Sequence, residues 1–157
     1  MNIRWKPNVT VAAVIERDGR FLLVEEHTPD GLQLNNPAGH LDRGETPIQG
    51  CRRETREETT HAFEPTALVG VYLSRQQKAD GKDITYLRFA FCGELGAADP
   101  SLSLDHGIVR TVWMTADEVR ASAPRHRSSV VLKCIEDYLA GQRFSLELLV
   151  CDASVGL

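Results

Sequence analysis

The chain has 157 residues, of which 42% are hydrophobic and 25% charged, and its formal net charge at pH 7 is −4. These values are ordinary for a soluble globular protein and predict one domain over residues 1–157, with a core over about residues 8–148. The acidic balance argues against a nucleic-acid polymer as partner. The chain has neither a signal-peptide pattern nor an apolar run near the roughly 18 residues of a membrane span, so we expect no membrane partner and a cytoplasmic location.

The cysteines lie far apart and include no Cys-x-x-Cys pair. This spacing predicts free thiols in a reducing compartment rather than disulfides or a zinc site. The residues are Cys51, Cys92, Cys134 and Cys151.

The first part of the chain has the pattern of a β-hairpin. Residues 8–15 are β-branched and apolar, Asp18-Gly19 is a turn signal, and residues 21–26 form the expected returning strand. A loop follows, and a short strand over residues 32–36 is expected to stop at Pro37.

The next element is a loop that turns into a helix. Thr46 suits the N-cap, Pro47 the first helical position, and Gln49 completes a Thr-x-x-Gln capping box. Ile48 and Cys51 are spaced so that one side of this helix can face a core.

The remaining sequence predicts further strands and two helices. Strands are expected over residues 67–74, 84–92 and 108–114, with a connection at 63–67, a polar hairpin loop at 75–82 and loop-rich sequence at 93–106. Thr115 should cap a short helix, and Ser128 or Ser129 should begin a last helix that stops at Gly141. Periodicity does not choose between an α+β fold and a mixed α/β/α sandwich.

The helix after Thr46 ends in clustered acids. Glu54, Glu57 and Glu58 are spaced by three and four residues, which places three carboxylates on one helix face. Like charges repel there, and the helix C-terminus itself carries partial negative charge. A divalent cation such as Mg²⁺ or Mn²⁺ would turn both effects into attraction. The alternative is a solvated acidic face offset by neighbouring arginines.

The spacing around these acids resembles the signature of a known family, the Nudix hydrolases. In order it consists of Gly39, five residues, Glu45, seven residues, Arg53-Glu54, two residues and Glu57-Glu58. The resemblance covers residues 9–148. Within the superfamily, the amino-acid sequences of residues 37–41, 87–89 and 141–147 resemble those of the phosphatase NudJ group.

This resemblance implies an α/β/α sandwich with a mixed central sheet and Mg²⁺-dependent hydrolysis, with Mn²⁺ as an alternative metal. It implies that Glu54, Glu57 and Glu58 hold the metal together with the main-chain carbonyl of Gly39. It further implies that Arg53 and Glu45 pair to fix the loop against the helix. Glu54 is also the candidate for the base that orients or deprotonates water.

Three residues at the end of the predicted helix differ from the family signature. In the family signature, an apolar residue usually occupies the position of Thr55, a glycine that of Thr60, and an apolar residue that of His61. Thr55 would be tolerated if its hydroxyl bonded the Cys51 carbonyl, whereas Thr60 would be strained at positive φ.

Two further residues are candidates outside the box. Asp105 is the nearest acid upstream of Trp113 and a candidate for an additional acid in the site. Arg88 is either a cation aimed at a substrate phosphate or a snorkelling sheet residue.

The leading functional hypothesis is hydrolysis of phosphoanhydride bonds in small nucleotides or related diphosphates. Nucleoside tri- and diphosphates, and a thiamine-precursor pyrimidine diphosphate, are the substrates that the resemblance implies. The alternatives are a non-catalytic domain that senses a nucleotide or binds a partner, and a hydrolase of ADP-ribose or dinucleoside polyphosphates. We expect a small phosphorylated substrate and a monomer or homodimer.

Overall fold

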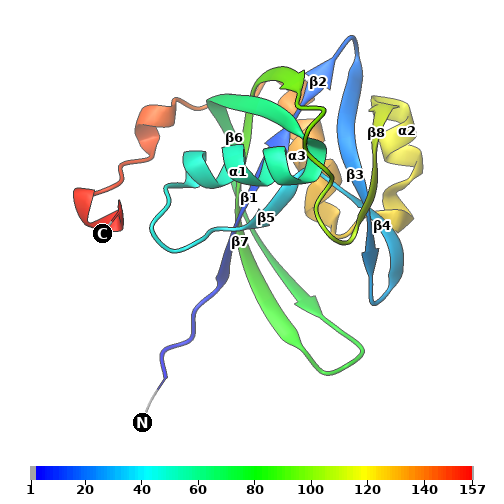
Figure 1. The fold of residues 1–157 in the computed structure, drawn as a ribbon. Helices are drawn as coiled ribbons and strands as arrows, with labels where there is room; N and C mark the ends of the chain where they lie inside the picture. The colour runs from blue at the N-terminus through cyan, green and yellow to red at the C-terminus, as the bar shows by residue number, and fades with distance from the viewer. Residues whose placement is uncertain (1–2, 157) are drawn as a thin grey trace.

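The computed structural model describes residues 3–156, which form three α-helices, several short 3₁₀ turns and two four-stranded sheets (Figure 1). The helices are α1 (Pro47–Thr59), α2 (Ala116–Ala121) and α3 (Ser129–Leu139). The strands are β1 (Asn8–Val14), β2 (Glu16–Arg17), β3 (Arg20–Thr28), β4 (Gly31–Asn35), β5 (Ala38–His40), β6 (His61–Gln77), β7 (Asp83–Ala98) and β8 (Ile108–Thr115). None of these helices has the length and apolar character that a bilayer crossing needs.

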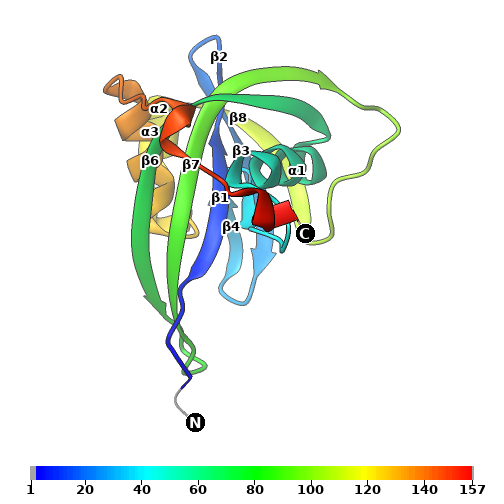
Figure 2. The same cartoon turned by 90° about the vertical axis from the view of Figure 1, so that its left-hand side faces the viewer.

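The central sheet is mixed, as expected. Its order is β5-β1-β7-β6, with β1 parallel to β7 and the other pairs antiparallel. Figure 2 shows α1 and α3 on opposite sides of β1 and β7. The predicted α/β/α sandwich is therefore confirmed.

The second sheet is built around β3. This strand pairs antiparallel with β2 and β4 and, along its other edge, with β8. A register shift against β8 falls between Glu25 and Glu26. The extra residue is Val109 of β8, and β3 itself stays in register with β4. Successive side chains of a strand point to opposite faces of the sheet, so these neighbouring acids find different partners, described below.

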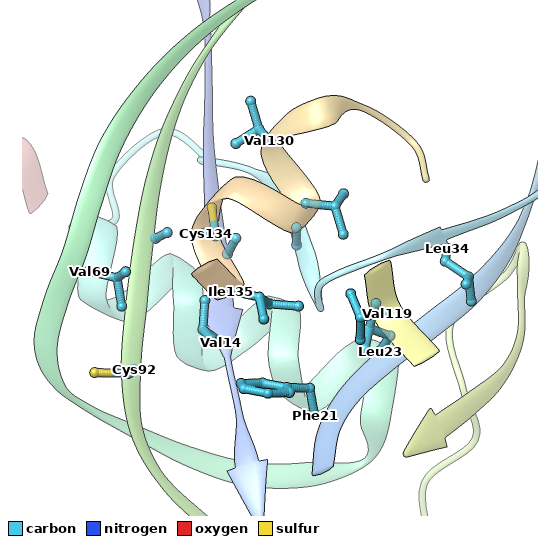
Figure 3. Close-up of a cluster of buried hydrophobic side chains, with 14 residues drawn as sticks. Val14, Phe21, Leu23, Leu34, Val69, Cys92, Val119, Val130, Cys134 and Ile135 are labelled. Carbon is cyan, nitrogen blue, oxygen red and sulfur yellow. The ribbon is translucent and has the colours of Figure 1, made fainter. Parts of the chain in front are cut away.

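Two apolar clusters hold the layers together. One lies between α3 and the sheets and includes Phe21, Leu23 and Ile135, all at most 2% exposed (Figure 3). The other lies under α1 and includes Cys51 and Phe91. Burial of side chains on both faces of β1 accounts for the nearly continuous apolar run at residues 11–15.

The capping and turn chemistry formed as the sequence predicts. Thr46 and Gln49 make a reciprocal capping box at α1, with Thr46 N donating to Gln49 Oε1 at 2.9 Å. Thr115 and Glu118 do the same at α2, and Ser128 caps α3. Asp18 and Gly19 both adopt positive φ, as a tight hairpin turn requires.

Three expectations about strand limits were wrong. Residues 63–67 are part of β6 rather than a connection, β7 continues to Ala98 through the stretch expected to be loop-rich, and β5 replaces part of the expected loop. Pro65 is tolerated because β6 is an edge strand. Its partner is Gly93, where a Cβ atom would stand 1.9 Å from the carbonyl oxygen of Glu64.

Candidate active site

Arg53 is the hub of the acidic end of α1. Its guanidinium donates to Glu45 at 3.0 and 2.7 Å, to Glu54 at 2.8 Å, to Glu57 at 3.2 Å and to the carbonyl of His40 at 2.9 Å. One side chain thus ties α1 to the loop before it and to the end of β5.

The pair between Arg53 and Glu45 has the geometry that the resemblance implies. It is bidentate, which adds directional specificity to the charge attraction. Glu45 also accepts from the backbone N–H of Asp42 at 2.7 Å. Hydrogen bonds from the Arg53 guanidinium and, to a smaller extent, from the backbone N–H of Asp42 lower the pKa of Glu45, so this carboxylate stays charged.

Glu54 lies directly over the backbone of Gly39. A Cβ atom placed on Gly39 would stand 2.1 Å from the Glu54 carboxyl carbon. Glycine is therefore required here for a close approach between β5 and α1 rather than for a special φ. Burial, with Glu57 and Asp105 nearby, raises the pKa of Glu54 against the opposing effect of Arg53.

Glu58 is the most deeply buried acid of the cluster. It is 6% exposed, and one oxygen accepts from the backbone N–H of Ala38 at 3.2 Å. Burial and the charges of Glu26, Glu54 and Asp105 raise the pKa of Glu58 to about 9. No Lys or Arg lies within ion-pairing distance of it among residues 3–156.

The Asp105 loop also reaches the acidic cluster. The backbone N–H of Asp105 donates to the Glu57 carbonyl at 2.9 Å, and its charge acts on both Glu54 and Glu58. The structure therefore places the Asp105 loop beside the end of α1 that carries Glu54, Glu57 and Glu58.

The donor set fits a hard divalent cation, although its geometry is not preassembled. Across residues 3–156, no three His, Cys, Asp or Glu side chains converge on a point that could hold a metal ion. Glu54 instead points at Arg53 and Glu58 at Ala38. A buried carboxylate without a cation is nonetheless the situation that Mg²⁺ or Mn²⁺ relieves, because both prefer oxygen ligands.

The helix end carries the strain that its sequence predicts. Thr60 is the C-cap of α1 and has a φ of 63°, in the left-handed region where a β-branched residue is rare. The hydrogen bond to the Cys51 carbonyl that would make Thr55 tolerable does not form. The Thr55 hydroxyl is buried and has no hydrogen-bond partner among residues 3–156, so this position would suit an apolar residue better.

Arg88 is not a snorkelling side chain. It is 8% exposed and donates to Asn36 Oδ1 at 2.8 Å and to Asn35 Oδ1 at 3.0 Å. It lines a cavity of about 220 Å³ that also touches Gly39 and His40. The cavity thus adjoins the acidic cluster.

Several residues of this cavity were missed in the sequence. Glu26 and Arg127 face it and form an ion pair at 2.8 Å, and Asn35 and Ser128 line it too. The visible signals were polar pairs at strand ends, Glu25-Glu26 and Asn35-Asn36, but their partners are remote in sequence.

Comparisons with known proteins identify the family of the chain. The family model described as "NUDIX domain" matches residues 5–133. The chain is 37% identical to the "Phosphatase NudJ" of Escherichia coli (strain K12) over 145 residues, 92% of each protein. It superposes on a NUDIX hydrolase from Nitrosomonas europaea with a TM-score of 0.87 and 51% identity, covering 94% of this chain and 98% of that one.

More distant structures share the fold alone. One is the solution structure of the E. coli ORF135 protein, which matches with a TM-score of 0.62 at 23% identity over 86% of this chain and 90% of that one. The family model spans most of the sequence, and the relatives match nearly end to end. The chain therefore belongs to the Nudix hydrolase family.

Proposed function

We propose that this Nudix hydrolase cleaves phosphoanhydride bonds in small nucleotides or related diphosphates, with Mg²⁺ as cofactor and Mn²⁺ as a substitute. The observation that carries the proposal is Glu58, a buried carboxylate near Glu54 and Asp105 that pairs with no Lys or Arg in the described part of the chain. An acid in that position is stable in its charged form only with a bound cation.

The proposed residue roles combine the family resemblance with the contacts. Glu54, Glu57 and Glu58 would hold the metal with the Gly39 carbonyl, and Asp105 would add a further acid. Glu54 is the candidate base for the attacking water. Arg53 and Glu45 keep the loop seated on α1 so that these groups keep their mutual positions. When bound, the metal supplies charge neutralisation at the phosphate oxygens and a more acidic water.

The similarity to a phosphatase supports release of inorganic phosphate from nucleoside tri- and diphosphates, and from a thiamine-precursor pyrimidine diphosphate. The volume of the cavity beside Gly39, about 220 Å³, favours such compact substrates over dinucleoside polyphosphates. It is smaller than the roughly 300–1,000 Å³ usual for ligand pockets. The 1–157 chain would act as one domain, in line with its end-to-end match to its relatives.

The test is a substrate panel with Mg²⁺, in which the released product is identified as phosphate or diphosphate. We expect turnover that disappears in Glu57→Gln and in Glu58→Gln. Glu64→Gln is the matched control because the Glu64 carboxylate pairs with Arg52, outside the proposed metal site. Unchanged turnover in Glu57→Gln and Glu58→Gln would remove the metal-ligand assignment.

A nucleotide-sensing domain is the alternative that a binding experiment separates. Thermal shift titrations with and without Mg²⁺ should show that the metal alone raises the unfolding temperature of the native chain and not of Glu58→Gln. Tight nucleotide binding without metal, and without any hydrolysis, would favour the sensor instead.

A further inference from the structure

The cavity beside Gly39 has one face of the central sheet as its floor. His40, Thr10 and Arg88 are neighbours across β5, β1 and β7 in one row of the register, and all three line the cavity. Tyr86 lies two residues along β7 and forms a tilted ring pair with His40, the centroids 6.2 Å apart. The floor therefore offers an aromatic surface next to a guanidinium.

Arg88 is a buried cation that no carboxylate neutralises within residues 3–156. Its guanidinium donates instead to the neutral amide oxygens of Asn35 and Asn36. An arginine carries five N–H donors and no acceptor. Charge and donors therefore remain for an acceptor placed in the cavity, where a hydrogen bond is stronger than in water.

Glu26 presents the opposite chemistry in the same cavity. Its side chain is 13% exposed, accepts from Arg127 at 2.8 Å and from the Asn35 amide at 3.4 Å, and lines the same cavity. A carboxylate has about four lone-pair sites, so it can accept a further donor.

These groups form one continuous hydrogen-bonded chain. Arg127 holds Glu26, Glu26 accepts from Asn35, and Asn35 accepts from Arg88. Each member fixes the direction of the next, so an acceptor-only group and a donor-only group are both held toward one small space. Such a wall is complementary to a ligand edge with one donor beside one acceptor.

We propose that this cavity binds the heterocyclic ring of the substrate, and that Arg88 and Glu26 select a ring with a nitrogen acceptor next to an amino group. The ring nitrogen accepts from Arg88, the amino group donates to Glu26, and the ring lies on Tyr86. Cytosine, adenine and other aminopyrimidines carry this edge. The inference rests on the proposed function and names its substrate class more closely.

The position of the cavity suits such a substrate. Gly39 and His40 line it on the side of the acidic helix end, and Glu26 lies close enough to Glu58 to raise its pKa. A ring held by Arg88 and Glu26 can therefore extend its phosphates toward Glu54, Glu57 and Glu58. The cavity of about 220 Å³ has room for one ring system.

The first test measures binding of cytidine monophosphate without metal, by calorimetry, so that hydrolysis plays no part. The comparison ligand carries 2-pyrimidinone in place of cytosine, which keeps the ring acceptor and lacks the amino group. We expect the native chain to prefer the amino ligand by about tenfold, the usual effect of leaving a buried polar group unsatisfied. Glu26→Gln should lose this preference.

Two variants separate contact from structural support. Arg127→Gln breaks the ion pair that orients Glu26 but keeps the Glu26 carboxylate, so the amino preference should shrink without being lost as it is in Glu26→Gln. Arg88→Lys should weaken both nucleotides about tenfold and leave Mg²⁺-dependent binding of methylenediphosphonate unchanged. The unfolding temperature of each variant confirms that it is folded.

The outcomes are distinguishable from failure of the proposed function. The selection stands if the Glu26-dependent preference is found, even if no substrate is hydrolysed. It is overturned if the native chain does not discriminate between the two rings or binds neither. Equal losses for nucleotide and methylenediphosphonate in Arg88→Lys would assign Arg88 to phosphate instead of the ring.

Discussion

The carboxylate of Glu54 occupies the space that a side chain at position 39 would fill, with 2.1 Å between its carboxyl carbon and an ideal Cβ on Gly39. The glycine that opens the signature motif is thus required by a residue of α1. The contact places a charged group of the helix against the backbone of β5.

Gly39→Ala should displace the Glu54 carboxylate while leaving the fold intact. Glu54 is the flexible partner in this contact, so the clash is relieved by moving its side chain rather than the backbone. We expect Mg²⁺-dependent phosphate release to fall about 10–100-fold, the range for lost support of metal-site groups. Steady-state kinetics measures it. Gly156→Ala is the control because nothing lies within 4 Å of a Cβ there.

Arg53→Lys should reduce turnover although the positive charge is retained. A lysine cannot make the bidentate contact with Glu45 while also reaching Glu54 and the His40 carbonyl. We expect a loss of at least about tenfold in kcat with a smaller change in unfolding temperature. Arg52→Lys, which disturbs only an exposed pair with Glu64, should retain activity. Equal kinetics for the two variants would contradict the role of Arg53.

Thr60→Gly should stabilise the protein. A non-glycine residue in the left-handed region destabilises the fold by about 1–2 kcal/mol. Glycine removes this strain but loses more backbone entropy on folding, which offsets about 0.5–1 kcal/mol of the gain. The net gain of about 0.5–1 kcal/mol corresponds to roughly 1–4 °C in unfolding temperature for a chain of this size. Thr60→Ala keeps the Cβ atom and should show no such gain. Calorimetry of both variants decides whether φ is the cause.

Glu25 should contribute stability that disappears in acid. Hydrogen bonds from Arg110 and Arg125 hold the pKa of this buried carboxyl below its usual 4.5. Its contribution is therefore complete above pH 4.5 and is lost as the pH falls through the lower, folded-state pKa. Glu25→Gln should lower the free energy of unfolding at pH 7 by about 1.5–3 kcal/mol, the usual contribution of charged hydrogen bonds.

The difference between native chain and Glu25→Gln should shrink below pH 4.5, as measured by urea unfolding across pH. Glu147→Gln is the control, since Glu147 forms no ion pair within the described chain. A difference that stays constant down to pH 3 would show that the charge of Glu25 is not the cause.

Local chemistry explains what the sequence predicted well. The caps at Thr46 and Thr115, the turn at Asp18-Gly19 and the acidic face of α1 depend on residues three or four positions apart. Such interactions are visible in a linear sequence because helix and turn geometry fixes their distances.

Pairing between distant residues explains what was missed. Pro65 suggested a break, but its place at the edge of the sheet and the glycine opposite let β6 continue. Arg88 meets Asn35 across 53 residues, and Arg127 meets Glu26 across 101. Nothing in the local pattern distinguishes these polar side chains from a solvated surface, so the cavity emerged only from the fold.

The alternation of side chains along β3 at Glu25 and Glu26 has a consequence for how this protein can vary. Glu25 binds Arg110 and Arg125, whereas Glu26 binds Arg127 and Asn35. Neighbouring positions would thus serve two separate functions, the predicted stability of the fold in acid for Glu25 and the proposed selection of the ligand for Glu26. Substitutions at either position can change one property alone. An insertion or deletion of a single residue in β3 would instead turn both side chains to the opposite faces of the sheet. We therefore expect insertions and deletions in β3 to be tolerated less well than substitutions.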